Sequence, residues 1–239
     1  FEKRDWPLLA VLVSYTLLIM LSSYSVCRAM VMPASFLVVL FYAIYLVVRN
    51  GVISYQKASG LAMFSGIVIF CFYSFIRLKE MLPVEEYGYD AIFFILLILC
   101  FAWGGDTCAY FAGRAFGKHK LCPVVSPKKT VEGAIGGVLG TMVFGVLVTV
   151  IYSIAADRME EFTRSNIGVS MYVIIALLAC VAAVLGIYGD LFASVVKRQC
   201  GIKDYGTIFP GHGGILDRFD SVMFIAPFVT MVVIAAFYN

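Results

Sequence analysis

Charged residues are scarce in this chain, and long hydrophobic runs leave little polar sequence between them. Of its 239 residues, 14% are charged and 62% are hydrophobic, and the mean hydropathy is +0.95. A soluble domain of this size needs more polar side chains to cover its surface, whereas lipid requires apolar side chains and internally satisfied backbone. The composition therefore excludes an ordinary soluble domain and predicts an all-α, polytopic integral membrane helix bundle.

Two further absences narrow the function. The seven cysteines form no C-x-x-C pair and mostly fall in apolar runs, so neither a disulfide framework nor a zinc site is indicated. The net charge is only +3, and the basic residues form no stripe with aromatic side chains. We therefore expect no nucleic-acid partner. The chain also begins at Phe1 without a methionine, which indicates that it is part of a longer protein.

The apolar runs predict about seven transmembrane helices. A window of about 19 residues places them at roughly 6–26, 31–49, 60–77, 91–112, 131–153, 170–193 and 219–238. No linker rich in Pro, Gly or Ser separates them, which predicts a single integral-membrane domain over residues 1–239. Within it we expect residues 1–90 to form scaffold helices and residues 91–239 to carry the catalytic helices and loops.

The Lys and Arg residues are divided unequally between the two sides of the predicted bundle. Most of the 18 fall in the N-terminal segment and in the second, fourth and sixth loops. By the positive-inside rule these segments face the cytoplasm. We therefore expect a protein of the bacterial inner or plasma membrane, whose two most basic loops, the fourth and the sixth, meet an anionic cytoplasmic substrate together. Alternatively, isolated Lys and Arg residues beside the membrane serve only to fix the orientation of the helices and to contact anionic headgroups.

The segment from Ser194 to Asp220 needs more than topology to explain it. Ionisable groups cost roughly 2.5–3.5 kcal/mol each at the centre of a membrane helix, so a dense cluster of both signs beside a membrane indicates function. In this segment the cations alternate with carboxylates around the Gly213-Gly214 pair. That mixture is typical of a metal-phosphate site, where carboxylates hold a hard cation and Lys or Arg neutralises phosphate oxygens.

Helical spacing places part of this chemistry on one face of the sixth span. Asp190, Ser194 and Lys197 are related as i, i+4 and i+7, which puts a carboxylate, a hydroxyl and an ammonium group together. Asp190 lies in an apolar run, so it needs an ion, a proton or a distant partner. We interpret this as metal binding.

Three other carboxylates are candidates for the same cation. Asp217 and Asp220 are spaced i and i+3, and we expect them at the start of the last span, where the helix dipole favours negative charge. Capping, or pairing with Arg218, is the structural alternative for both. Asp106 interrupts the fourth span and is a further candidate ligand.

The glycines of the fifth span and the lysines before it have two interpretations each. Gly133 with Gly137 and Gly136 with Gly140 fit close helix packing through small residues; a phosphate cradle is the weaker alternative. In Ser126–Gly133 we expect a helix entry capped by Thr130. The lysine pair in that segment either anchors the helix at the interface or binds an anion near the helix N-terminus.

The run from Ser194 to Asp220 resembles the signature of the CDP-diacylglycerol synthase family, the phosphatidate cytidylyltransferases. The matching residues are Ser194, Val196, Lys197, Arg198, Lys203, Asp204, Gly206, Phe209, Pro210, His212, Gly213, Gly214, Ile215, Asp217, Arg218, Phe219 and Asp220. The resemblance extends to Gly189-Asp190, to Ser126–Gly133 and to the stretch from Asp106 to Gly113, whereas Phe1 to Asp90 match only in being hydrophobic. Members usually carry further N-terminal helices, which agrees with an incomplete chain.

The resemblance implies a nucleotidyltransferase of phospholipid biosynthesis that joins CTP to phosphatidic acid in the lipid bilayer, giving CDP-diacylglycerol and pyrophosphate with Mg²⁺ and room for a second cation. It implies catalytic roles for Asp190, Lys197, Arg198, Lys203, Asp204, His212, Asp217, Arg218 and Asp220. Substrate binding would fall to Lys128, Lys129, Ser194, Gly213, Gly214 and Arg114, and metal binding to Asp190, Asp217, Asp220 and Asp106. A homodimer is left open.

Two other functions share features with this one. Another CTP-dependent membrane enzyme, such as a polyprenol or phytol kinase, would use the same charges with a different acceptor. A cation transporter would also place Asp106 and Asp190 inside helices, but it would not need a loop of Lys, Arg and Gly-Gly suited to phosphate.

Overall fold

The computed structural model describes residues 6–48, 55–158, 168–207 and 213–237. These residues are almost entirely helical, as the composition predicts, and they form two compact units, Phe1–Glu80 and Met81–Asn239. The boundary between the two units falls between Glu80 and Met81. The first unit is built from α1 (Trp6–Met20), α2 (Ser25–Val48) and α3 (Tyr55–Met81).

Apolar side chains and a few polar contacts hold the first unit together. Leu8, Leu12, Tyr42 and Ala58 form its buried cluster, and the Tyr15 and Ser35 hydroxyls lie 2.7 Å apart. These residues come from all three helices. The unit carries none of the predicted site residues.

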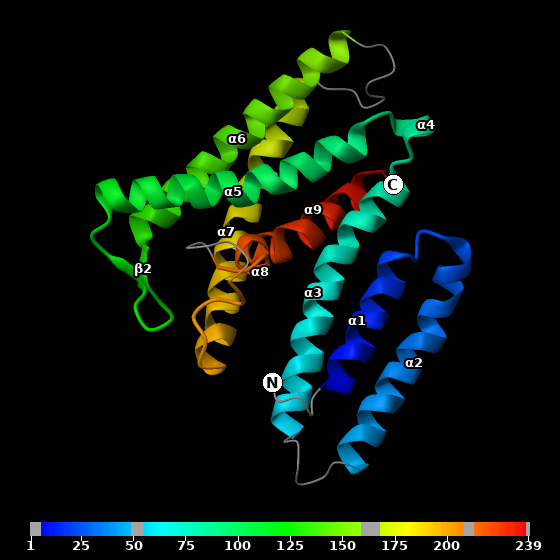
Figure 1. The fold of residues 1–239 in the computed structure, drawn as a ribbon. Coiled ribbons are helices and arrows are strands. Elements are labelled where there is room, and N and C mark those ends of the chain that lie inside the picture. The colour runs from blue at the N-terminus through cyan, green and yellow to red at the C-terminus, as the bar shows by residue number, and fades with distance from the viewer. Residues whose placement is uncertain (1–5, 49–54, 159–167, 208–212, 238–239) are drawn as a thin grey trace. The chain divides into compact units, whose positions relative to one another are not determined.

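The second unit contains every candidate site residue. Its elements, in chain order, are α4 (Val84–Tyr87), α5 (Asp90–Phe116), β1 (Lys120–Cys122), β2 (Ser126–Thr130), α6 (Val131–Arg158), α7 (Val169–Gln199), α8 (Leu216–Phe219) and α9 (Val222–Phe237). Helices α5, α6, α7 and α9 pack on one another (Figure 1). Strands β1 and β2 pair antiparallel between α5 and α6.

The seven predicted spans correspond to seven apolar helices. Five of them, in α2, α3, α5, α6 and α7, are long and apolar enough to cross a membrane, whereas α1 and α9 are shorter. Large apolar side chains such as Leu139, Val143 and Leu177 are exposed along α6 and α7, as expected for helices that face lipid. The last helix begins at Val222, so the prediction that Asp217 and Asp220 start it is wrong: Asp217 lies in α8 and Asp220 follows it.

Small residues let α5 and α6 approach closely, as the glycine spacing predicts. A Cβ added at Gly133 would lie 2.8 Å from the carbonyl oxygen of Ala109, and one added at Gly136 would overlap the Cβ of Ala112. The close-packing interpretation of these glycines is therefore confirmed. It fixes the relative position of the two helices that flank the hairpin.

Replacing Gly136 with Ala is expected to destabilise the protein by about 1–3 kcal/mol, because the new methyl group has no room against Ala112. The matched control is Gly66→Ala in α3, where an added Cβ meets nothing within 4 Å. Removing a helical glycine there should be neutral or stabilising by up to about 1 kcal/mol. Thermal unfolding in detergent measures both, and equal transition temperatures for the two variants would contradict the packing.

The hairpin between α5 and α6 was not predicted. We expected a helix entry over Ser126–Gly133, but Ser126–Thr130 form β2 and α6 begins only at Val131. Thr130 does cap α6 as predicted, because its hydroxyl accepts the N–H of Gly133 at 3.1 Å. The start of α6 also holds the hairpin, since Glu132 accepts hydrogen bonds from the N–H groups of Lys118 and His119 and lies 2.6 Å from His119 Nδ1.

Candidate active site

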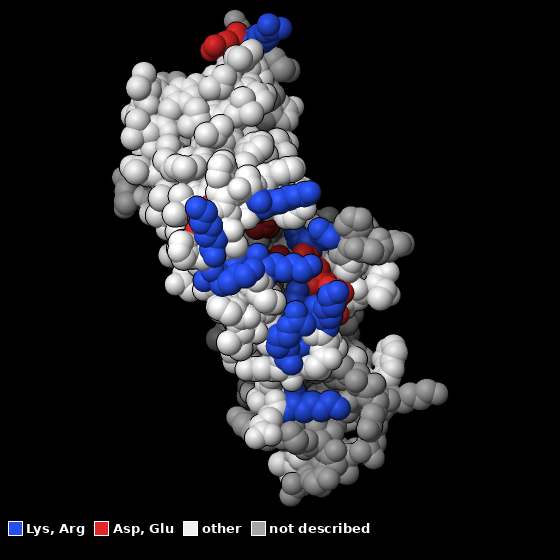
Figure 2. Space-filling model, turned by 90° about the vertical axis from the view of Figure 1, so that its left-hand side faces the viewer, with Lys and Arg blue, Asp and Glu red and all other residues white. Residues whose placement is uncertain are grey.

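Charged residues from several elements of the second unit gather beside the C-terminal half of α7. Figure 2 shows Lys and Arg side chains surrounding recessed acidic side chains on one face. There Lys129 Nζ of β2 lies 2.5 Å from Asp190 Oδ2 of α7. The Ser194 hydroxyl, one turn further along α7, donates to Asp190 Oδ1 at 3.3 Å. This contact confirms that Asp190 and Ser194 share a face of α7, as predicted, and the Lys129 pair brings β2 beside α7.

Lys197 is the buried cation of the site. Its side chain is 11% exposed, and its ammonium group lies 2.8 Å from Asp217 Oδ1 and 4.0 Å from Asp220 Oδ2. The ring of Tyr205 lies below it, 5.2 Å from centroid to nitrogen. A buried ammonium group needs such partners because an unpaired charge is costly away from water. Lys197 therefore neutralises carboxylates in this arrangement.

Asp217 organises the loop that follows α7. Its Oδ2 accepts the N–H groups of Tyr205 at 2.8 Å and Gly214 at 2.9 Å, while Oδ1 accepts Lys197. Burial raises the pKa of Asp217, but the hydrogen bonds from Lys197 and the two backbone groups outweigh it and leave the pKa below its usual range. A carboxylate offers about four lone pairs, so one on Oδ1 stays available.

The Gly-Gly pair has a structural reason to be beside Asp217. Gly213 has φ = 83°, in the left-handed region, and a Cβ there would lie 3.0 Å from Asp217 Oδ2. A Cβ at Gly214 would lie 2.8 Å from the nitrogen of Gly206. Both positions require glycine for the backbone to come this close to the carboxylate and to the loop.

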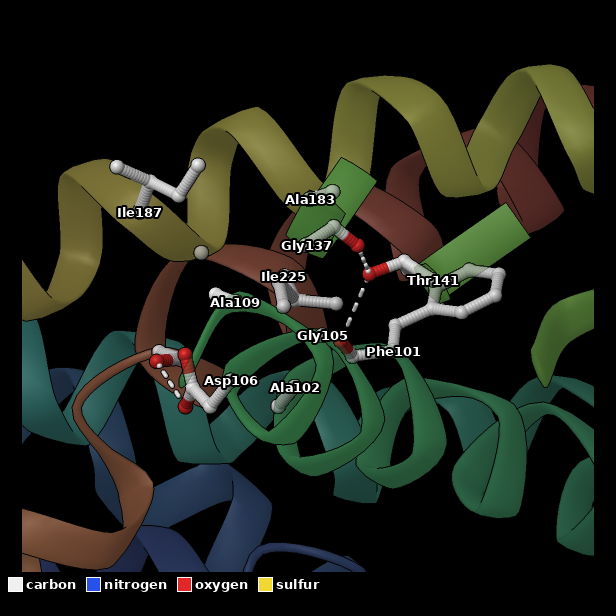
Figure 3. Close-up of a pocket in the computed structure, with 12 residues that line it drawn as sticks. Phe101, Ala102, Gly105, Asp106, Ala109, Gly137, Thr141, Ala183, Ile187 and Ile225 are labelled. Atoms are coloured by element: carbon white, nitrogen blue, oxygen red, sulfur yellow. Dashed lines mark hydrogen bonds between the residues drawn. The ribbon is translucent and has the colours of Figure 1, made fainter. Parts of the chain in front are cut away.

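Asp220 and Asp106 complete a set of carboxylates near Asp190. The pKa of Asp220 is raised to about 7, because burial and the negative charge of Asp190 together outweigh the opposing charge of Lys197. Asp106 of α5 accepts the Ser221 hydroxyl at 2.9 Å. It lies at the edge of a pocket lined largely by small residues of α5, α6 and α7 (Figure 3). Asp220 thus interacts electrostatically with Asp190 of α7 and Asp106 of α5, and Lys197 joins it to Asp217.

The remaining predicted site residues that the structure describes are exposed. Arg114 is exposed at the end of α5, where its Nη1 donates to the Tyr110 hydroxyl at 3.4 Å. Four further predicted site residues are exposed and form no ion pair with another described residue: Lys128, Arg198, Lys203 and Asp204. Arg218 is also exposed. His212 lies outside the described residues.

Three residues at the site escaped the sequence analysis. Tyr205 and Ser221 stand at positions that the family signature leaves open or does not reach. Trp103 of α5 donates its indole N–H to the Arg218 carbonyl at 3.0 Å, and its ring meets that of Phe219 edge to face at 5.9 Å. No local sequence pattern indicated a role for Trp103, because its hydrogen-bond partner lies 115 residues away along the chain.

The donor set fits Mg²⁺ in type. All of its side-chain donors are carboxylate oxygens, and Mg²⁺ is usually held by one or two carboxylates together with substrate phosphates. Within the described ranges, no group of three or more His, Cys, Asp or Glu side chains is placed to hold a metal ion. The four-carboxylate metal site therefore stays a prediction, and a site completed by substrate phosphates is compatible with this arrangement.

The fold and the site together define a polytopic helical membrane protein with a mixed-charge site at one end of its helices. Comparison with known proteins makes this definition specific. The profile of the cytidylyltransferase family matches residues 1–236. The chain therefore belongs to the cytidylyltransferase family.

Curated relatives carry a more specific name. The chain is similar to the phosphatidate cytidylyltransferase of Bacillus subtilis (strain 168), with 32% identity over 198 residues, covering 83% of this chain and 66% of that protein. It is also similar to the phosphatidate cytidylyltransferase of Staphylococcus haemolyticus (strain JCSC1435), with 39% identity over 145 residues, covering 61% of this chain and 50% of the relative. The chain thus spans half to two thirds of the length of these proteins.

Proposed function

We propose that the protein transfers the cytidylyl group of CTP to phosphatidic acid, giving CDP-diacylglycerol and pyrophosphate. Two ion pairs support this best. Lys129 of the hairpin pairs with Asp190 of α7, and the buried Lys197, further along α7, pairs with Asp217. Such a site offers cations for phosphate oxygens beside carboxylates for a hard cation. The names of the relatives point to the same reaction.

The reaction needs positioning more than it needs a strong base. A phosphate oxygen of phosphatidate attacks the α-phosphorus of CTP, a new P–O–P bond forms, and the bond to the β-phosphate breaks with its electron pair leaving on pyrophosphate. The nucleophile is already ionised, so no Ser-His pair is required. The difficulty is to bring two polyanions together, and electrostatic stabilisation and positioning dominate in such transfers.

The chain's residues divide this task. Asp190 and the remaining lone pair of Asp217 would hold Mg²⁺, with Asp220 and Asp106 beside them. When bound, Mg²⁺ would neutralise negative charge on the phosphates. Exposed cations of the second unit would attract the phosphates of the two substrates; they are Arg114, Lys128, Arg198, Lys203 and Arg218. Lys129 would exchange its carboxylate partner for a substrate phosphate. We place these loops on the cytoplasmic side, as the distribution of cations predicts.

The direct test uses the purified protein in detergent with CTP, phosphatidate and Mg²⁺. Pyrophosphate should be released only when both substrates and the metal are present. Activity with a lipid alcohol and none with phosphatidate would remove the proposal in favour of a lipid kinase. Ion flux through liposomes without nucleotide would instead indicate a transporter.

Replacing Trp103 with Phe is expected to lower this activity by about threefold to tenfold, the worth of one hydrogen bond. Phe keeps an aromatic edge against Phe219 but cannot donate to the Arg218 carbonyl, so α8 and its Asp217 lose a fixed position. The matched control is Trp6→Phe in α1, an exposed tryptophan of the first unit. Initial rates of pyrophosphate release measure the activity of both variants. Equal activity of the two would contradict a role for the Trp103 hydrogen bond in positioning α8.

A further inference from the structure

Ser221 occupies a closely packed turn between α8 and α9. It is 2% exposed. Gly189 of α7 makes room for the turn, because a Cβ there would lie 2.6 Å from the Asp220 carbonyl oxygen. The packing leaves Ser221 little freedom, so its two polar groups have fixed directions.

Both polar groups of Ser221 point at carboxylates of the site. Its backbone N–H donates to Asp220 Oδ1 at 2.9 Å, and its hydroxyl donates to Asp106 Oδ2 at 2.9 Å. Figure 3 shows the second contact as the dashed line at Asp106. One residue thus joins a carboxylate of α5 to a carboxylate 114 positions later in the chain.

Asp106 depends on this contact for its position. Its side chain is exposed, and among the described residues the Ser221 hydroxyl is its one hydrogen-bond donor. The negative charge of Asp190 acts on it from nearby and outweighs the attraction of Lys129. Asp220 and Asp106 repel each other as well, and like charges separate unless something holds them. Without the hydroxyl, repulsion would turn the Asp106 side chain away from the other carboxylates.

We propose that Ser221 is a positioning residue, whose hydroxyl holds Asp106 beside Asp220 so that the site binds its divalent cation tightly. The proposal rests on the proposed function only in that this reaction requires the cation. It predicts a change in metal affinity that is measured without any substrate. Partners that orient the groups around a metal typically contribute about 10–100-fold in affinity.

The test measures Mn²⁺ binding to the purified protein in detergent, from the electron paramagnetic resonance signal of free Mn²⁺. Mn²⁺ takes the same oxygen ligands as Mg²⁺. We expect Ser221→Ala and Ser221→Cys to raise the Kd for Mn²⁺ by about tenfold or more. Cysteine fills the space of the serine but is only a weak hydrogen-bond donor. The Kd of the cysteine variant therefore tests the proposal even if the alanine variant does not fold.

Two comparisons separate positioning from packing. Thr141→Val removes another buried hydroxyl of the same pocket, one that donates to the Gly137 carbonyl at 2.8 Å, and it should bind Mn²⁺ as the wild type does. In an Asp106→Ala background, Ser221→Ala should have no further effect on the Kd, because Ser221 acts through Asp106.

The outcomes are distinct. A wild-type Kd in Ser221→Cys, an equal loss in Thr141→Val, or additive losses with Asp106→Ala would each overturn the proposal, as would absence of Mn²⁺ binding by the wild type. A wild-type protein that binds Mn²⁺ with this pattern but makes no CDP-diacylglycerol would support the role of Ser221 and defeat the proposed function.

Discussion

Replacing Asp190 with Asn is expected to lower the rate of CDP-diacylglycerol formation by about 10²–10³-fold. Asn has the size of Asp and still offers an amide oxygen to the Ser194 hydroxyl, so the fold should persist. It lacks the negative charge that pairs with Lys129 at 2.5 Å and that we assign to the cation. The loss should appear in kcat at saturating CTP, because the charge acts on the phosphates during transfer rather than on recognition of the base.

The matched control for Asp190→Asn is Asp157→Asn. Asp157 is an exposed carboxylate near the far end of α6 in the same unit. The two variants lose the same charge and should unfold at similar temperatures. Wild-type turnover in Asp190→Asn, or equal losses in both variants, would remove Asp190 from the reaction.

Helical spacing predicted the part of this site that lies on one helix. Asp190, Ser194 and Lys197 share a face because three residues on a continuous α-helix have only one relative arrangement. The glycines of α6 were predictable for a similar reason, since small residues four positions apart form a flat stripe that a neighbouring helix can approach. Both predictions depend on local geometry alone.

The rest of the site depends on contacts between distant segments. The sequence did not reveal that the ammonium group of Lys197 pairs with Asp217, 20 residues later. It placed Asp217 and Asp220 on one helix, but the chain leaves α8 after Phe219 and turns before α9 begins at Val222. This turn depends on Gly189 of α7, whose lack of a side chain makes room for the Asp220 carbonyl. Sequence patterns near Asp220 therefore could not predict the turn.

Lys197→Met is expected to damage both stability and activity. Lys197 and Asp217 have side chains that are 11% and 9% exposed, and removing one partner of a buried ion pair costs about 3–5 kcal/mol because the other charge stays uncompensated. We expect the lower end of this range, since Asp217 keeps its two backbone donors. Methionine preserves the length of the apolar stem, so the loss reports on the ammonium group.

The activity of Lys197→Met should fall further than its stability explains. Without the ammonium group, Asp217 and Asp220 repel each other, and the loop held by Asp217 loses one of its three hydrogen bonds. Lys79→Met, at an exposed lysine near the end of α3, is the matched control. Thermal unfolding and initial rates at a temperature where both variants are folded measure the two effects. A fully active Lys197→Met protein would contradict the arrangement of charges described above.

The central claim is that the site moves the cytidylyl group, rather than a terminal phosphate, onto a lipid. The most direct measurement gives the purified protein CTP labelled in turn at the α-phosphorus and at the γ-phosphorus, with phosphatidate and Mg²⁺, and follows the label into the lipid fraction. The account predicts that α-label enters the lipid while γ-label leaves as pyrophosphate. Entry of γ-label into the lipid, or of neither label, would contradict it.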